Sequence, residues 1–104
     1  MYLCIWQILF RTDRGKNMQT LADLEITQSD ARKVLEKLEP IDFSEGPLEE
    51  KMHGIGGMWV FGKEVKKKEI YIKVAMGHEG LPVICISFHV AKEKMNYPFK
   101  NIKP

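Results

Sequence analysis

The feature that most constrains this chain is a two-residue alternation of apolar and polar side chains in two segments, EIYIKV (69–74) and ICISFH (84–89). Successive side chains of a β-strand point to opposite faces of its sheet, so each segment predicts a half-buried strand. Each strand would bury three apolar side chains and would hold the others out on a second face. The residues predicted on this second face are Glu69, Tyr71, Lys73, Cys85, Ser87 and His89.

Two helices are expected before these strands. The stretch RGKNMQTLADLE predicts a short helix with Asn17 as its N-cap. A second helix is expected at 28–38, because Thr27 is a good N-cap and Asp30 stands at the capping-box position. Pro40 ends this helix.

The remaining segments complete the predicted fold. Strands are expected at 5–11, 58–65, 69–76 and 82–90. The Gly- and Pro-rich residues 40–57 predict a loop, and the tail from about residue 95 is expected to pack through Met95, Tyr97 and Phe99 and then to fray. Strand, helix, helix and three strands predict one α+β domain over 1–104, with an antiparallel or mixed sheet of about four strands and both helices on one face.

The lysine-rich turn at 66–68 decides which side chains join the second face. A three-residue turn, which we expect, places Lys63 opposite Tyr71 and carries Trp59 and Phe61 to the same face. A two-residue turn would bring Trp59 and Phe61 inward instead.

Such a face suits single-stranded RNA, because lysines neutralise phosphates and exposed rings stack on bases. Cleavage without a metal requires a base for the 2′-hydroxyl, a cation near the phosphorane and an acid for the leaving oxygen. Imidazole can serve as acid or base, a phenol can donate a proton, and an ammonium group can hold the charge. The expected catalytic residues are His89, Tyr71, Lys73 and Lys63, with RNA contacts from Trp59, Phe61 and Ser87. A polar sheet face that merely meets water remains the alternative.

Composition supports an ordinary globular domain with an uneven charge. The chain has 104 residues and a net charge of +2. Residues 1–54 carry 7 Lys and Arg against 10 Asp and Glu, whereas residues 55–104 carry 9 against 4. The basic second half would suit a phosphate-facing surface or a solvated one.

The apolar opening MYLCIWQILF has ten residues, well short of the roughly 20 that span a membrane, and it predicts a strand.

The cysteines and histidines argue against a metal site. Cys4 and Cys85 are too few for a disulfide scaffold and are expected to be reduced and buried in a cytoplasmic protein. His53, His78 and His89 lack the spacing of metal ligands. We therefore expect no metal and no cofactor.

Four stretches together resemble the MqsR-type toxins of bacterial toxin–antitoxin pairs: GKNMQTLADLEIT, DARKVLEKLEPIDFSEGP, WVFGKEV…EIYIKV and VICISFH…MNYPFK. The resemblance covers about residues 5–100 in order. It implies a small endoribonuclease that cleaves single-stranded mRNA, with a RelE-like α+β fold and no metal. It also implies a partner, a cognate antitoxin that would carry zinc-binding Cys-x2-Cys pairs and a helix-turn-helix.

The site residues that the resemblance implies match in part. The family's functional Tyr falls on Tyr71, and its catalytic Lys falls on His89, which is another proton-handling cation. A further family Lys falls on Glu45, and the family Gln falls on Val60. Three cations that follow the first strand would supply part of the lost positive charge, and we expect them to bind RNA: Arg11, Arg14 and Lys16. The two departures leave open a non-catalytic module of the same fold that binds RNA or a protein.

Overall fold

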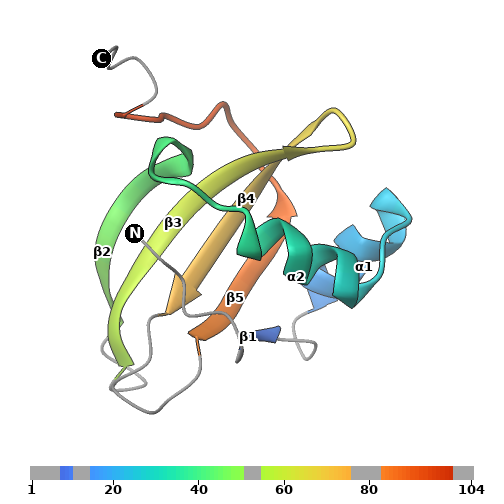
Figure 1. The fold of residues 1–104 in the computed structure, drawn as a ribbon, viewed down its shortest axis with the longest axis horizontal. Coiled ribbons are helices and arrows are strands. Elements are labelled where there is room, and N and C mark those ends of the chain that lie inside the picture. Colours follow the sequence, from blue (N-terminus) through green and yellow to red (C-terminus); the bar gives the residue numbers. More distant parts are fainter. Residues whose placement is uncertain (1–7, 11–14, 51–54, 76–82, 100–104) are drawn as a thin grey trace.

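The computed structural model describes residues 8–10, 15–50, 55–75 and 83–99 (Figure 1). Its helices are α1 (Gly15–Leu24), α2 (Gln28–Glu36) and the short 3₁₀ helix η1 (Pro40–Asp42). Its strands are β1 (Ile8–Phe10), β2 (Phe43–Glu50), β3 (Ile55–Val65), β4 (Lys68–Ala75) and β5 (Val83–Val90). The predicted α+β class, with two helices against an antiparallel sheet, is confirmed.

The sheet contains one more strand than expected. Its order is β1-β5-β4-β3-β2, in which β2 to β5 are antiparallel and β1 runs parallel to β5 at the edge. The prediction of a loop over 40–57 was wrong for 43–50, which forms β2, and for 55–57, which begins β3. Three register shifts interrupt the pairing of β2 with β3, and Gly46 and Pro47 lie within the strand. These irregularities remove the two-residue period that would have revealed β2 in the sequence.

The turn between β3 and β4 contains two residues, not three. Val65 pairs with Lys68, and the turn residues Lys66 and Lys67 have φ angles of 49° and 68°. Two consecutive positive φ angles are typical of the type I′ hairpin turn, whose usual sequence is Asn-Gly. Lysines at these positions concealed the turn type.

The shorter turn reverses the predicted facing of β3. Phe61 pairs with Ile72 and is buried in the main core, and Trp59 packs against that core. Gly62, not Lys63, lies opposite Tyr71. The expectation that Trp59, Phe61 and Lys63 share the second face was therefore wrong.

A bulge changes the facing of half of β5. Lys73 pairs with Ser87 while Val74 pairs with Cys85, so Ile86 is an extra residue on β5. Cys85 consequently lies in the main core, where we had expected Ile84 and Ile86. Simple alternation holds only beyond the bulge, from Ser87 to Val90.

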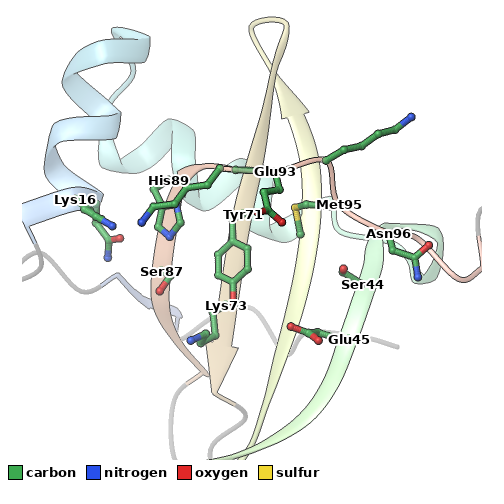
Figure 2. Close-up of a pocket in the computed structure, with 14 residues that line it drawn as sticks. Lys16, Ser44, Glu45, Tyr71, Lys73, Ser87, His89, Glu93, Met95 and Asn96 are labelled. Carbon is green, nitrogen blue, oxygen red and sulfur yellow. The ribbon is translucent and has the colours of Figure 1, made fainter.

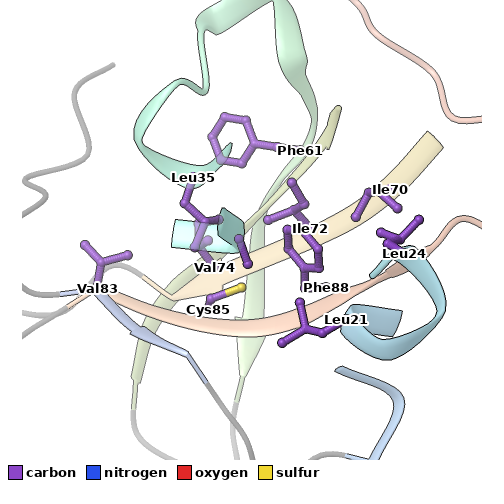
Figure 3. Packing of buried hydrophobic residues seen from close by; sticks show 11 residues of the cluster. Leu21, Leu24, Leu35, Phe61, Ile70, Ile72, Val74, Val83, Cys85 and Phe88 are labelled. Atoms are coloured by element: carbon purple, nitrogen blue, oxygen red, sulfur yellow. The ribbon is translucent and has the colours of Figure 1, made fainter. Parts of the chain in front are cut away.

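The core lies between the helices and the sheet (Figure 3). Leu21 and Leu24 of α1 and Leu35 of α2 meet the β4 residues Ile70 and Ile72. A smaller cluster occupies the other side of the sheet and contains Met58, Ala75 and Ile86, with Leu48 and Ile84 against it. The second face is therefore apolar near the bulge and polar toward the end of β5.

Of the two N-caps predicted from the sequence, the structure has only Thr27 at the start of α2. Thr27 and Asp30 form the predicted reciprocal capping box, with N···O distances of 3.1 and 3.0 Å. The Thr27 hydrogen bonds lower the pKa of the Asp30 carboxyl. Asn17 is not an N-cap, because α1 already begins at Gly15.

Candidate functional site

The centre of the second face is a stacked pair formed by Tyr71 of β4 and His89 of β5. The two residues are directly opposite in the β4–β5 register. Their ring centroids are 5.0 Å apart and the ring planes differ by 12°. The His89 Nδ1 atom lies 3.1 Å from the backbone oxygen of Val90. An Nδ1–H donor there would leave Nε2 to exchange a proton with a ligand.

Lys73 and Ser87 form the next pair along the same two strands. The Lys73 ammonium lies 5.9 Å from the centroid of the Tyr71 ring, within the range of a cation–π contact. Ser87 is only 4% exposed, so its side chain forms part of the floor. Alternation therefore placed Tyr71, Lys73, Ser87 and His89 correctly on one face.

These four side chains line an open pocket of about 600 Å³ (Figure 2). Its walls come from α1, β2, β4, β5 and the tail, defined here as residues 91–99. The charged lining residues are Lys16, Lys73, Lys92, Lys94, Glu45 and Glu93, together with His89. Lysines outnumber glutamates, so the pocket favours an anionic ligand.

Glu45 is a pocket residue whose position depends on the unexpected strand β2. Figure 2 shows its carboxylate directed from β2 toward Tyr71 and Lys73. Burial raises the pKa of Tyr71, and the negative charge of Glu45 raises it further. Strand and loop patterns placed Glu45 in a loop, and only the resemblance, in which a functional family Lys falls on Glu45, pointed to this position.

Asn17 fastens α1 to the outer edge of β5 beside the pocket. Its Nδ2 donates to the backbone oxygen of Ile86, and its Oδ1 accepts from the backbone N–H of Phe88, each at 2.9 Å. The side-chain amide thus bonds β5 as a neighbouring strand would, and Asn17 is 1% exposed. It also places Lys16, the preceding residue, at the pocket wall.

The tail forms the rim of the pocket and is held by Glu69 of β4. The Glu69 backbone oxygen accepts from Ala91 N at 2.9 Å. The Glu69 carboxylate accepts hydrogen bonds from Met95 N at 3.1 Å and from the Tyr97 hydroxyl at 2.6 Å. Phe99 continues the contact, with its ring centroid 5.5 Å from that of Phe43. These contacts hold the tail against the sheet, and the end of the chain that was predicted to fray lies outside the described residues.

Several predicted site residues lie elsewhere. Lys63 is on the helix-covered face, where its Nζ forms an ion pair with Asp42 Oδ2 at 3.1 Å. Lys63 is therefore removed from the predicted catalytic set, and Trp59 and Phe61 from the RNA contacts. Arg11 and Arg14 lie outside the described residues.

The Cys85 thiol lies in the main core. Burial raises the pKa of the Cys85 thiol to about 12, which suits a core residue rather than a nucleophile. Within the described ranges, no group of three or more His, Cys, Asp or Glu side chains could hold a metal ion. Cys4, His53 and His78 fall outside those ranges.

No helix in the described part of the chain has the length and apolar character needed to cross a membrane.

Comparison with known proteins gives no assignment: no family model, no curated protein and no solved structure matches this chain. The pocket and its side chains must therefore support any functional conclusion.

Proposed function

We propose that this protein is a metal-independent endoribonuclease that cleaves single-stranded mRNA. The observation that carries the proposal is the stacked Tyr71–His89 pair, with Lys73 beside it, in an open and predominantly cationic pocket. The strands fix these side chains relative to one another, as proton transfer requires.

Each step of RNA cleavage has a candidate group in the pocket. The 2′-oxygen attacks phosphorus and the bond to the 5′-oxygen breaks, so one proton must leave and another must be delivered. We assign the role of base to the Glu45 carboxylate, whose oxygens can accept a proton, and the role of acid to His89, which would protonate the 5′-oxygen. Lys73 and the Tyr71 hydroxyl would stabilise the phosphorane oxygens. The products would carry a 2′,3′-cyclic phosphate and a 5′-hydroxyl.

The biological role follows the sequence resemblance to MqsR-type toxins. We propose that the enzyme is a cytoplasmic toxin of a type II toxin–antitoxin pair, silenced by an antitoxin encoded beside it. Expression alone should then arrest a bacterial host, and co-expression of the neighbouring reading frame should restore growth.

A non-catalytic interaction module is the second candidate. The carboxylates of Glu45 and Glu93 in the pocket favour it, because they oppose a bound phosphate. Such a module would bind RNA or a protein without cleaving either.

Cleavage of a single-stranded oligoribonucleotide by the purified protein tests the proposal. His89→Ala should reduce the rate by about 10²- to 10⁴-fold, the usual scale for a positioned acid or base. Tyr71→Phe should reduce it less, because the ring that stacks on His89 remains. His89→Lys should retain more activity than His89→Ala, since an ammonium group can still deliver a proton. Absence of cleavage by the wild type, or equal cleavage by His89→Ala, would contradict the proposal.

A further inference from the structure

Ser87 of β5 carries a hydroxyl for which the described part of the chain supplies no partner. The residue is 4% exposed and lines the pocket, yet its side chain forms no hydrogen bond with any residue that the structure describes. Every fully enclosed side-chain N or O atom of the described residues has a partner, so the Ser87 oxygen is open to the pocket. Buried polar groups are nearly always hydrogen-bonded, and an exception at a pocket floor points to a ligand that supplies the partner.

The first turn of α1 is fixed directly beside this hydroxyl. The Asn17 amide bonds Ile86 O and Phe88 N, each at 2.9 Å. These two backbone groups flank Ser87 in the sequence. The first backbone N–H groups of a helix have no partner inside the helix, and a helix N-terminus carries a partial positive charge. Asn17 thus brings an electropositive helix end to Ser87, and Lys16 of the same turn lines the pocket.

Positive charge gathers at this end of the pocket, which we call the α1 corner and which contains Lys16, Ser87 and Lys73. Lys73 pairs with Ser87 across β4 and β5. Figure 2 shows the three residues on the α1 side of Tyr71, and Glu45 on the β2 side. Among the described pocket residues that belong to α1 and β5, none is acidic. Two ammonium groups, a helix N-terminus and a hydroxyl donor form a set that suits a phosphate group.

The proposed roles of Glu45 and His89 give an RNA strand a direction across the pocket. The base acts on the 2′-hydroxyl of the nucleotide before the cleaved bond, and the acid protonates the 5′-oxygen of the nucleotide after it. The first nucleotide would therefore lie toward β2, and the second toward β5 and α1. Ser87 is two residues from His89 along β5, about 7 Å at the usual strand rise, and one nucleotide unit spans a similar distance. The next phosphate on the 3′ side would thus reach the α1 corner.

We propose that the α1 corner binds the phosphate immediately 3′ to the cleaved linkage, through Ser87, Lys16 and the first turn of α1. This inference rests on the proposed function, because the roles of Glu45 and His89 set the direction of the strand. A phosphate is the same in every nucleotide, so the contact positions the RNA without selecting its sequence. The enzyme would therefore favour linkages inside a strand over the linkage to a 3′-terminal nucleoside.

The test compares three dinucleotides that differ only in their terminal groups. All have 2′-O-methyl sugars and cannot be cleaved; one ends in hydroxyls, one carries a 3′-phosphate and one carries a 5′-phosphate. Dissociation constants are measured by proton–nitrogen chemical-shift titration. The variants Ser87→Ala and Lys16→Gln each remove one group of the α1 corner. The matched controls are Ser44→Ala, which removes a hydroxyl from the β2 side of the same pocket, and Lys33→Gln, which removes a charge from exposed α2.

The 3′-phosphate should tighten binding to the wild type about 10-fold relative to the dinucleotide that ends in hydroxyls, the lower end of what a hydrogen bond to a charged group contributes. This gain should fall at least about 3-fold in Ser87→Ala and in Lys16→Gln, and should persist in both controls. Absence of a gain in the wild type, or an equal or larger gain from the 5′-phosphate, would overturn the proposal. So would equal gains in Ser87→Ala and Ser44→Ala.

Cleavage of unmodified RNA by the wild type separates this inference from the proposed function. Cleavage without a gain from the 3′-phosphate would contradict the α1 corner as a phosphate site and leave the proposed function standing. Absence of cleavage would contradict the proposed function, whatever the dinucleotides show.

Discussion

Replacing Asn17 with alanine would remove the amide that closes the outer edge of β5. In the folded protein this amide donates to Ile86 O and accepts from Phe88 N, both at 2.9 Å. The site is 1% exposed, so water would not readily replace the lost partner. The substitution therefore removes the side-chain partner of one backbone acceptor, Ile86 O, and of one backbone donor, Phe88 N, in the protein interior.

The cost can be worked from these two groups. A buried polar group left without a partner costs about 1–3 kcal/mol. Alanine is the better helix former and returns roughly 0.5 kcal/mol within α1. The net loss should be about 2–5 kcal/mol, against a total stability of about 5–15 kcal/mol for a domain of this kind. For a urea m-value of about 2 kcal/mol/M, the unfolding midpoint should fall by roughly 1–2.5 M.

Urea unfolding followed by circular dichroism measures this loss. Gln19→Ala is the matched control, because Gln19 lies on the same helix and bonds Asp23 at an exposed site. It should cost about 0.5 kcal/mol or less. Amide exchange of Phe88 should also quicken in Asn17→Ala. If Asn17→Ala costs no more than the control, the amide does not stabilise the edge of β5 and the reasoning is refuted.

Two further predictions concern the tail. Burial, and then the hydrogen bond to Glu69, raise the pKa of Tyr97, so the neutral hydroxyl stabilises the fold. That contribution is complete below the ordinary tyrosine pKa of about 10 and is lost as the pH rises through the higher pKa of the folded protein. In urea unfolding, Tyr97→Phe should therefore lose less stability at alkaline pH than the wild type does. An unchanged pH dependence of the stability would contradict this cause. A Cβ at Gly62 would overlap the Tyr97 ring, so Gly62→Ala should displace the tail and speed amide exchange at Met95, whereas Gly15→Ala, which meets nothing within 4 Å, should not. Equal exchange in the two variants would show that the tail does not depend on this contact.

The sequence was most informative where local rules act alone. The Thr27–Asp30 capping box depends on neighbouring residues and was predicted in full. The facing of Tyr71 and His89 was also predicted, because alternation is uninterrupted from Ser87 onward. These elements gave the α+β class and the centre of the pocket.

The errors came from features with weak local signals. Lysines in a type I′ turn concealed the register of β3, so Trp59, Phe61 and Lys63 were assigned to the wrong face. The bulge at Ile86 depends on the pairing of β5 with β4, and the residue types near Ile86 do not indicate a bulge. Asn17 bonds Ile86 and Phe88, which lie 69 and 71 positions further along the chain. Helix propensity contains no information about contacts between residues so far apart in the sequence.

The irregular pairing of β2 also affects how two copies of this protein can meet. β2 is the last strand of the sheet, so its outer backbone groups could recruit a strand from another molecule. Pro47 has no N–H to offer, Gly46 has a φ of 143°, and the register shifts three times along the strand. A second strand could not form a continuous ladder of hydrogen bonds with β2, so the irregular backbone of β2 disfavours polymerisation through this edge.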